Sequence, residues 1–128
     1  MKNRKKIFII MILFIGLSIA SIAFAVSRTS GIFFAKGEKY SVEGKYGTTI
    51  YPTIRATQLI GTPVINVKCQ KKVLFGFNSG ANMDITITEA NRTYYAAFEA
   101  ESAGTFRITW EQTNDQASMI ANVDVESY

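Results

Sequence analysis

The sequence predicts an all-β fold: a single antiparallel β-sandwich or jelly-roll-like domain that follows an N-terminal signal peptide. The main evidence is the arrangement of apolar residues after residue 25, which alternate with polar residues over short runs, as in half-buried strands. No window in this part of the sequence has the sustained apolar period of an amphipathic helix. Gly, Asn, Ser and Pro separate the runs at roughly ten-residue spacing, which is typical of a sandwich of short strands.

The N-terminal residues predict export. A basic head precedes an apolar run, and Ala25 ends the small-x-small pattern that signal peptidase accepts. We therefore expect residues 1–25 to be a signal peptide that is cleaved after Ala25. An uncleaved membrane anchor is the alternative, because residues 7–26 are just long enough to span a hydrocarbon core of about 30 Å. Both interpretations place residues 26–128, the exported domain, outside the cell, since the positive-inside rule keeps the basic head in the cytoplasm.

The first half of the exported domain contains short or irregular extended runs. Ile65, Val67 and Cys69 form one apolar face, and another alternating run follows it. Pro52 and Pro63 stand at boundaries between runs, where a missing N–H does little harm to a strand ladder. The strands expected in this half are 32–35, 40–43, 47–51, 54–57, 65–69 and 73–77.

Alternation is clearest in the second half. In one run, Tyr94 and Phe98 share the apolar face, and Tyr95 and Glu99 share the polar face. Trp110 lies on the apolar face of the next run and is expected in the core. The strands expected in this half are 83–88, 93–100, 105–111 and 121–126.

The exported domain has no net charge, which argues against nucleic-acid binding. The chain has 14 Lys and Arg against 10 Asp and Glu, but four of the cations stand in residues 1–25. The remaining charges are distributed unevenly, with a net +6 in residues 26–72 and a net −6 in residues 73–128. We expect strands of the two halves to pair and to place opposite charges side by side. The alternative is a dipolar molecule that stacks head to tail or docks on a charged envelope polymer.

Most of the residues that build common catalytic sites are missing. The chain has no histidine, which excludes Ser-His-Asp and Cys-His catalysis and imidazole-ligated metal sites. It has no Gly-rich phosphate loop, C-x-x-C or EF-hand pattern, so we expect no cofactor and no metal. Cys69, the only cysteine, shares the apolar face of its strand and is expected to be buried and structural rather than nucleophilic. Glu99 and Glu101 are the main candidates for carboxylate catalysis, although their place beside a turn favours solvated surface charge.

An exposed aromatic residue supplies the best candidate binding site. Tyr95 lies on the polar face of its strand with Glu99, and Glu101 follows at the same spacing. Arg107, on the outer face of the following strand, is expected to lie opposite one of these carboxylates. A ring flanked by such charges is typical of a sheet face that holds a sugar ring or a partner side chain. The predicted ligand-binding residues are therefore Tyr95, Glu99, Glu101 and Arg107.

Export and the missing catalytic groups favour one class of function. We expect a small, non-enzymatic β-sandwich protein, secreted or at the extracellular cell surface, that acts as a binding module for a cell-envelope polysaccharide or a protein partner. The lack of any possible intramolecular disulfide favours a bacterial source. Membrane contact is expected only through the leader, if it stays uncleaved. Two alternatives stay open: a secreted antagonistic factor (a bacteriocin, a small toxin or its immunity protein) and a carboxylate-based hydrolase.

N-terminal sequencing of the exported protein is expected to begin at Val26, with the domain in the medium or the wall fraction. Recovery of the full-length chain from carbonate-washed membranes would show instead that residues 7–26 are an anchor.

Overall fold

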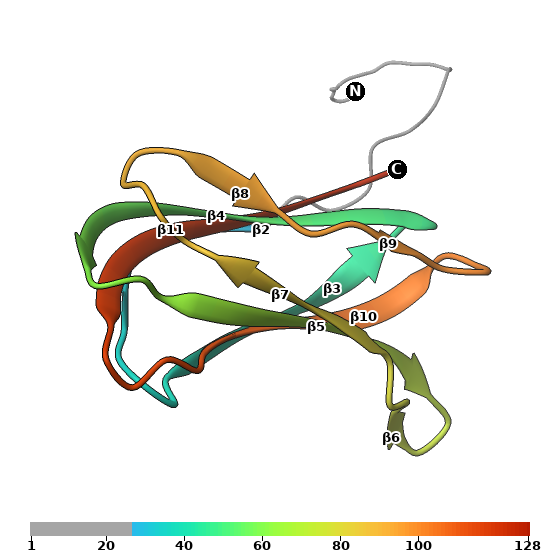
Figure 1. Ribbon diagram of the computed structural model, residues 1–128. Coiled ribbons are helices and arrows are strands. Elements are labelled where there is room, and N and C mark those ends of the chain that lie inside the picture. The colour runs from blue at the N-terminus through green and yellow to red at the C-terminus, as the bar shows by residue number, and fades with distance from the viewer. Residues whose placement is uncertain (1–26) are drawn as a thin grey trace.

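The computed structural model describes residues 27–128, which form two antiparallel sheets packed face to face (Figure 1). The predicted all-β sandwich is therefore confirmed. The expected signal peptide, residues 1–25, lies outside the described residues. None of the described residues belongs to a helix that is long and apolar enough to cross a membrane.

The first sheet contains four main strands and a short hairpin arm. Its order is β3, β10 and β5, with β7 along the free side of β5 and β6 paired to the end of β5. The bounds are β3 Lys39–Tyr46, β10 Gly104–Gln112, β5 Val64–Val73, β6 Gly76–Phe77 and β7 Ala81–Thr86.

The second sheet is ordered β2, β11 and β4, and two short segments, β8 and β9, share the outer edge of β4. If β6 is set aside and β8 and β9 count as one interrupted strand, eight strands remain, and their order in the two sheets is that of a jelly roll. The chain changes sheet at every step except from β5 to β7. The bounds are β2 Ser27–Phe34, β11 Ser118–Ser127, β4 Thr49–Ile60, β8 Thr93–Tyr95 and β9 Phe98–Glu99.

The inward faces of the two sheets form one continuous core. Trp110 is fully buried, as predicted, and its ring centroid lies 6.3 Å from that of Tyr40. Alternation along β10 and β11 is nearly perfect, so every second residue of these central strands enters the core. The largest buried side chains, besides Trp110, are Tyr46, Phe34, Ile50, Ile54, Ile65, Ile87 and Ile108.

Pro52 lies inside a strand rather than at a boundary, so the separate strands expected at 47–51 and 54–57 are wrong. The long β4 runs through it, and Pro52 is buried opposite Val125 of β11. On the side of β4 that faces β8 and β9, Ala96 N donates to the Pro52 carbonyl at 2.9 Å. Pro52 has no N–H group, so it cannot donate a second bond to Ala96. The ladder is therefore interrupted here, and the strand expected at 93–100 appears as β8 and β9 in one unbroken register.

The strand expected at 73–77 is also wrong, because the chain reverses within it. Val73 pairs with Gly76, and Lys72 pairs with Phe77, so Leu74 and Phe75 form the turn of a tight hairpin between β5 and β6. Gly76 has a φ of 93°, which favours glycine at this reversal. The alternation of apolar residues at 73, 75 and 77 therefore does not mark a buried face.

The early cationic strands pair with the late anionic strands, as expected. β10 lies between β3 and β5, and β11 lies between β2 and β4. Arg107 stands opposite Glu43, and Glu111 stands opposite Lys39. The two charge-biased halves of the sequence are thus interleaved in space.

A buried amide holds the corner where the chain passes from β10 to β11. Gln112 is fully buried, and its Nε2 donates to the carbonyls of Asn114 and Ala117, at 2.8 Å each. Its Oε1 accepts from the backbone N–H groups of Asn114 at 2.6 Å and Val64 at 3.4 Å. One side chain therefore satisfies four backbone groups in this corner.

Replacement of this amide by an apolar side chain of similar size is expected to destabilise the protein. Gln112→Leu should lower the free energy of unfolding by about 3 kcal/mol, because several buried backbone groups lose their partners. Gln58→Leu, at an exposed position of β4, is the matched control and should stay within about 0.5 kcal/mol. Equal denaturation midpoints for the two variants in urea would contradict this role of Gln112.

Candidate functional site

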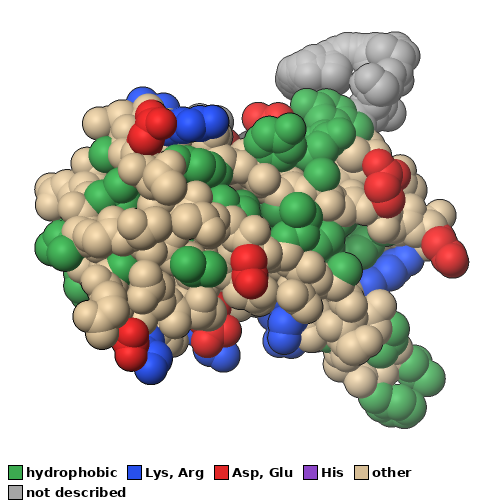
Figure 2. Space-filling model, in the orientation of Figure 1, with side chains coloured by type: hydrophobic (Ala, Val, Ile, Leu, Met, Phe, Trp, Pro, Cys, Tyr) green, Lys and Arg blue, Asp and Glu red, His purple; other side chains and the backbone are tan. Residues whose placement is uncertain are grey.

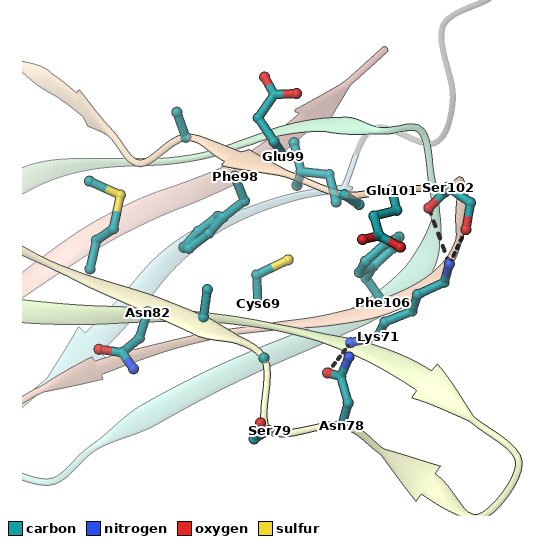
Figure 3. A pocket seen from close by; sticks show the side chains of 16 residues that line it. Cys69, Lys71, Asn78, Ser79, Asn82, Phe98, Glu99, Glu101, Ser102 and Phe106 are labelled. Carbon is teal, nitrogen blue, oxygen red and sulfur yellow. Dashed lines mark hydrogen bonds between the residues drawn. The ribbon is translucent and has the colours of Figure 1, made fainter.

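A groove with a volume of about 670 Å³ lies at one open side of the sandwich. One wall comes from β5, β7 and the turn before β7, and the other comes from β9 and the loop that follows it (Figure 3). These two walls belong to different sheets. We call this site the edge groove.

The floor of the edge groove is apolar. Cys69, Phe98, Phe106 and Ile50 are buried side chains that line it from both sheets. Met83 also lines the groove and stays partly exposed, although it lies on the inward side of β7. The groove therefore reaches down to the edge of the hydrophobic core.

The rim of the groove is polar and is closed at one end by a lysine. Lys71 crosses from β5 to the other wall, where its Nζ donates to Ser102 Oγ and to the Ser102 carbonyl. The same Nζ lies 5.7 Å from the ring centroid of Phe106. Figure 3 shows the Glu101 side chain directed toward this end of the groove and the Glu99 carboxylate directed away from it.

Both walls of the groove end in a free strand edge. Ile87 N donates to the Pro63 carbonyl, so Ile85, Met83 and Ala81 are the residues of β7 that bond to β5. The intervening residues direct their N–H and C=O groups to the unpaired side. On the other wall, Ala96 N donates to the Pro52 carbonyl, so Tyr94, Ala96 and Phe98 are the residues that face β4. The residues between and beside them direct their backbone groups to the unpaired side. Within residues 27–128, the free edges are formed by Asn82, Asp84 and Thr86 on one wall and by Tyr95, Ala97 and Glu99 on the other.

Gly80 allows the chain to pass close over β5 at the wall of the groove. Gly80 begins the approach to β7 with a φ of 68°, and a Cβ at this position would lie 2.1 Å from the Cys69 carbonyl oxygen. Only glycine permits this close passage of the chain over β5.

Cys69 lies at the floor of the groove but is not an activated thiol. Burial raises the pKa of Cys69 to about 11, and the side chain is only 7% exposed. Lys71 shares the inward face with Cys69, but its ammonium group is bound to Ser102. The predicted burial of Cys69 is confirmed.

No group of three or more Cys, Asp or Glu side chains within residues 27–128 is arranged to hold a metal ion.

The structure brings three of the four predicted site residues to one edge strand. Tyr95 and Glu99 are exposed on the outer side of this strand, as alternation predicted. Glu101 is also exposed, but it follows the end of β9 and its side chain is directed toward the groove instead (Figure 3). Only Glu99 and Glu101 line the edge groove. Tyr95 lies outside the groove, on the outer face of the second sheet.

The predicted place of Arg107 is wrong. β10, which carries it, belongs to the first sheet, whereas β8 and β9 pair with β4 in the second sheet. Arg107 instead donates to Gln70 Oε1 at 3.1 Å, and its guanidinium carbon lies 4.2 Å from the ring centroid of Phe77. It therefore supports the β5–β6 hairpin rather than a carboxylate near Tyr95.

Tyr95 has aromatic neighbours that the sequence analysis missed. Its ring centroid lies 6.3 Å from that of Tyr51, which in turn lies 6.3 Å from that of Tyr128, and both pairs meet edge to face. The hydroxyl group of Tyr128 donates to Glu126 at 3.4 Å. We call Tyr51, Tyr95 and Tyr128 the tyrosine cluster. Continuous alternation through Pro52 would have placed Tyr51 on the outer face of its strand, but the pairing of β4 with β8 that brings it to Tyr95 has no local signal.

The groove residues Lys71, Met83 and Phe98 were also missed as site residues. Alternation does place Lys71 on the same face as Cys69, two positions along β5, and this signal was available in the sequence. No local signal indicates that β7 and β9 border one groove, because that arrangement depends on strands from two sheets.

Comparison with known proteins adds only a general likeness of fold. No family model matches the chain, and no curated protein matches its sequence. The crystal structure of the Yersinia pseudotuberculosis-derived mitogen is similar over 82% of this chain and 87% of that chain, with 8% identity and a TM-score of 0.47. The solution structure of a de novo designed double-stranded β-helix is similar over 80% of this chain and 99% of that chain, with 15% identity and a TM-score of 0.39. Both are β-rich, and at these scores the likeness extends no further.

The buried thiol predicts a pH dependence of stability. Because the folded-state pKa of Cys69 is about 11 and the ordinary value is 9.0, the unfolded chain loses this proton first as pH rises. The contribution of the neutral thiol to stability is fully present below pH 9 and is lost as pH approaches 11. Wild-type protein should therefore lose more stability than Cys69→Ala over this interval.

The difference in stability between wild-type protein and Cys69→Ala isolates the contribution of the thiol, because every other ionisable group is common to the two proteins. Below pH 8 the variant should be less stable by about 1 to 2 kcal/mol. A bulky thiol reagent should label native protein slowly and unfolded protein fast, and rapid labelling of native protein would overturn the structural role of Cys69.

Proposed function

We propose that this protein is a small, exported, non-enzymatic binding module whose edge groove takes up an extended peptide segment of a protein partner. The observation that carries the proposal is the combination of an apolar floor with two free strand edges in one groove. An extended peptide offers backbone N–H and C=O groups to such an edge, and its alternate side chains can enter the floor. The partner would lie in the medium or the cell envelope.

The chemistry of the groove agrees with peptide binding. Its volume of about 670 Å³ is enough for two or three side chains of a bound segment. Phe98 and Met83 offer apolar contact, while Lys71 and Glu101 at the rim supply one cation and one carboxylate for orientation. The exposed carboxylate of Asp84 on the β7 edge guards against indiscriminate pairing with other strands.

The tyrosine cluster supports a second candidate, in which the same module binds a cell-envelope polysaccharide. Tyr95 is 64% exposed, and its edge-to-face contact with Tyr51 holds the ring in place. A sugar ring stacks on such an aromatic face, and carboxylates of the type of Glu126 and Glu99 accept hydrogen bonds from its hydroxyls. The rings of the cluster meet edge to face, so the surface suits one sugar ring more than a long flat chain.

The two alternative functions receive less support. A carboxylate hydrolase needs two carboxyl groups aimed at one bond, whereas Glu99 and Glu101 are directed differently in Figure 3. No feature of the groove specifically favours an antagonistic factor or its immunity protein, although either could bind a partner peptide in it.

A proline at the free edge tests the peptide proposal. Asn82 directs its N–H away from β5, so Asn82→Pro should remove a donor to the ligand while leaving the β5–β7 ladder intact. Asn82→Ala is the matched control, because both variants lose the side-chain bond from Asn66 Nδ2. Peptides selected from a displayed random library should bind wild-type protein and Asn82→Ala, and at least about tenfold more weakly to Asn82→Pro.

Two further measurements make the result specific. N-methylation of alternate amides in a selected peptide should abolish its binding, and bound peptide should slow hydrogen exchange at the amides of Asn82 and Asp84. A glycan array probed with wild-type protein and Tyr95→Ala tests the second candidate. Peptides that bind Asn82→Pro and wild-type protein equally would refute the edge-groove proposal, and sugar binding lost only in Tyr95→Ala would transfer the function to the tyrosine cluster.

A further inference from the structure

The β5–β6 hairpin carries the most exposed apolar side chains of the described residues. Leu74 is 88% exposed and Phe75 is 90% exposed, and they form the turn itself. The hairpin projects from the body of the sandwich (Figure 1), and Figure 2 shows a lobe of hydrophobic side chains at the same place. We call Leu74 and Phe75 the hairpin tip.

The base of the hairpin is tied to the sandwich on both sides. Asn78 exchanges bonds with Lys71, since its N–H donates to the Lys71 carbonyl and its Oδ1 accepts from the Lys71 N–H, at 2.9 Å each. Gln70 Nε2 donates to the Asn78 carbonyl at 3.0 Å. On the outer face, Arg107 packs over the Phe77 ring. These contacts hold the apolar tip away from the core instead of letting it fold back.

Cations gather at the end of the sheet from which the hairpin projects. Lys72 is exposed and precedes the tip by two positions. Lys71 and Arg107 also lie near the base, but they are half-buried and bonded to Ser102 and Gln70. Lys45 lies at the same end of the sheet, on β3 opposite Thr105. The carboxylates of Glu43 and Glu101 offset this charge only in part. An apolar tip above a cationic base is complementary to a bilayer with anionic headgroups.

We propose that the hairpin tip inserts into the interfacial region of an anionic lipid bilayer, with the exposed cations Lys72 and Lys45 on the headgroups. The tip is convex and two residues wide, so it matches a deformable apolar medium better than the flat surface of a folded partner. This contact is distinct from the membrane contact expected through the N-terminal segment. It goes beyond the proposed binding function and does not depend on it, although the edge groove begins directly after the hairpin.

The test places a fluorescent reporter in the tip of the full chain. Phe75→Trp adds an indole at the tip, while the native Trp110 is fully buried and serves as a constant background. With vesicles of phosphatidylcholine and phosphatidylglycerol, the emission should shift to the blue and be quenched by brominated lipid. Ile60→Trp is the matched control, because Ile60 is 69% exposed but lies at the end of β4, beyond the opposite end of β5. Its emission should not change.

Affinity changes then separate the two contributions to binding. In the Phe75→Trp background, Leu74→Glu should weaken vesicle binding at least about tenfold. The transfer of a Leu side chain from water to an apolar medium changes a partition coefficient by more than this factor. Lys72→Glu should weaken it roughly tenfold or more on phosphatidylglycerol vesicles and have little effect on pure phosphatidylcholine. Ile60→Glu in the same background should leave binding unchanged.

Three results would overturn the proposal. The first is an unchanged emission of Phe75→Trp at saturating lipid, and the second is an equal response of Ile60→Trp. The third is a blue shift that depends on protein concentration without lipid, since this would assign the tip to contact with a second copy of the chain. Far-UV circular dichroism of each variant checks that the sandwich is retained, and a result on the hairpin leaves the edge-groove proposal untouched.

Discussion

The corner between β10 and β11 is the constraint on which the rest of the sandwich depends. These strands are consecutive in sequence, yet each lies inside a different sheet between two strands from the first half of the chain. Gln112 satisfies the backbone groups of the corner and so sets where the chain leaves one sheet and enters the other. Because side chains alternate with a period of two, a slip of one residue here would turn a whole core face outward. Trp110 and Val123 would then both leave the core.

The same topology creates the candidate site. Central positions for β10 and β11 leave β7 in one sheet and β8 and β9 in the other as edge strands on the same side of the molecule. Buried side chains of the core line the space between these edges, and Lys71 joins the two walls through its bonds to Ser102. The hairpin tip extends from the same end of β5, so a ligand in the groove and a surface touched by the tip would be neighbours. The two proposed contacts therefore belong to one end of the protein.

The uneven charge distribution of the sequence does not become a dipole along the chain, because the fold interleaves the two halves. Arg107 and Glu43 face each other across neighbouring strands, and Lys39 and Glu111 do the same. The two halves therefore place opposite charges on neighbouring strands of one sheet. What stays uneven is the hairpin end, where Lys71 and Lys72 follow one another before the chain turns back.

The sequence by itself determined the fold class and the facing of individual side chains. Alternation correctly predicted the burial of Trp110 and Cys69 and the exposure of Tyr95 and Glu99, because the pleat of a strand is a local property. Alternation wrongly predicted one strand over 73–77, because a period of two does not reveal where a chain reverses.

Only the tertiary structure decided which side chains meet. Arg107 lies in the sheet opposite to Tyr95, and Tyr51 reaches Tyr95 through a strand that continues across Pro52. Across the edge groove, Lys71 of one wall donates to Ser102 of the other wall. Strand partners and sheet membership arise from contacts between segments far apart in the chain, and the free energy that selects them comes from burial of the whole core, which no local pattern contains.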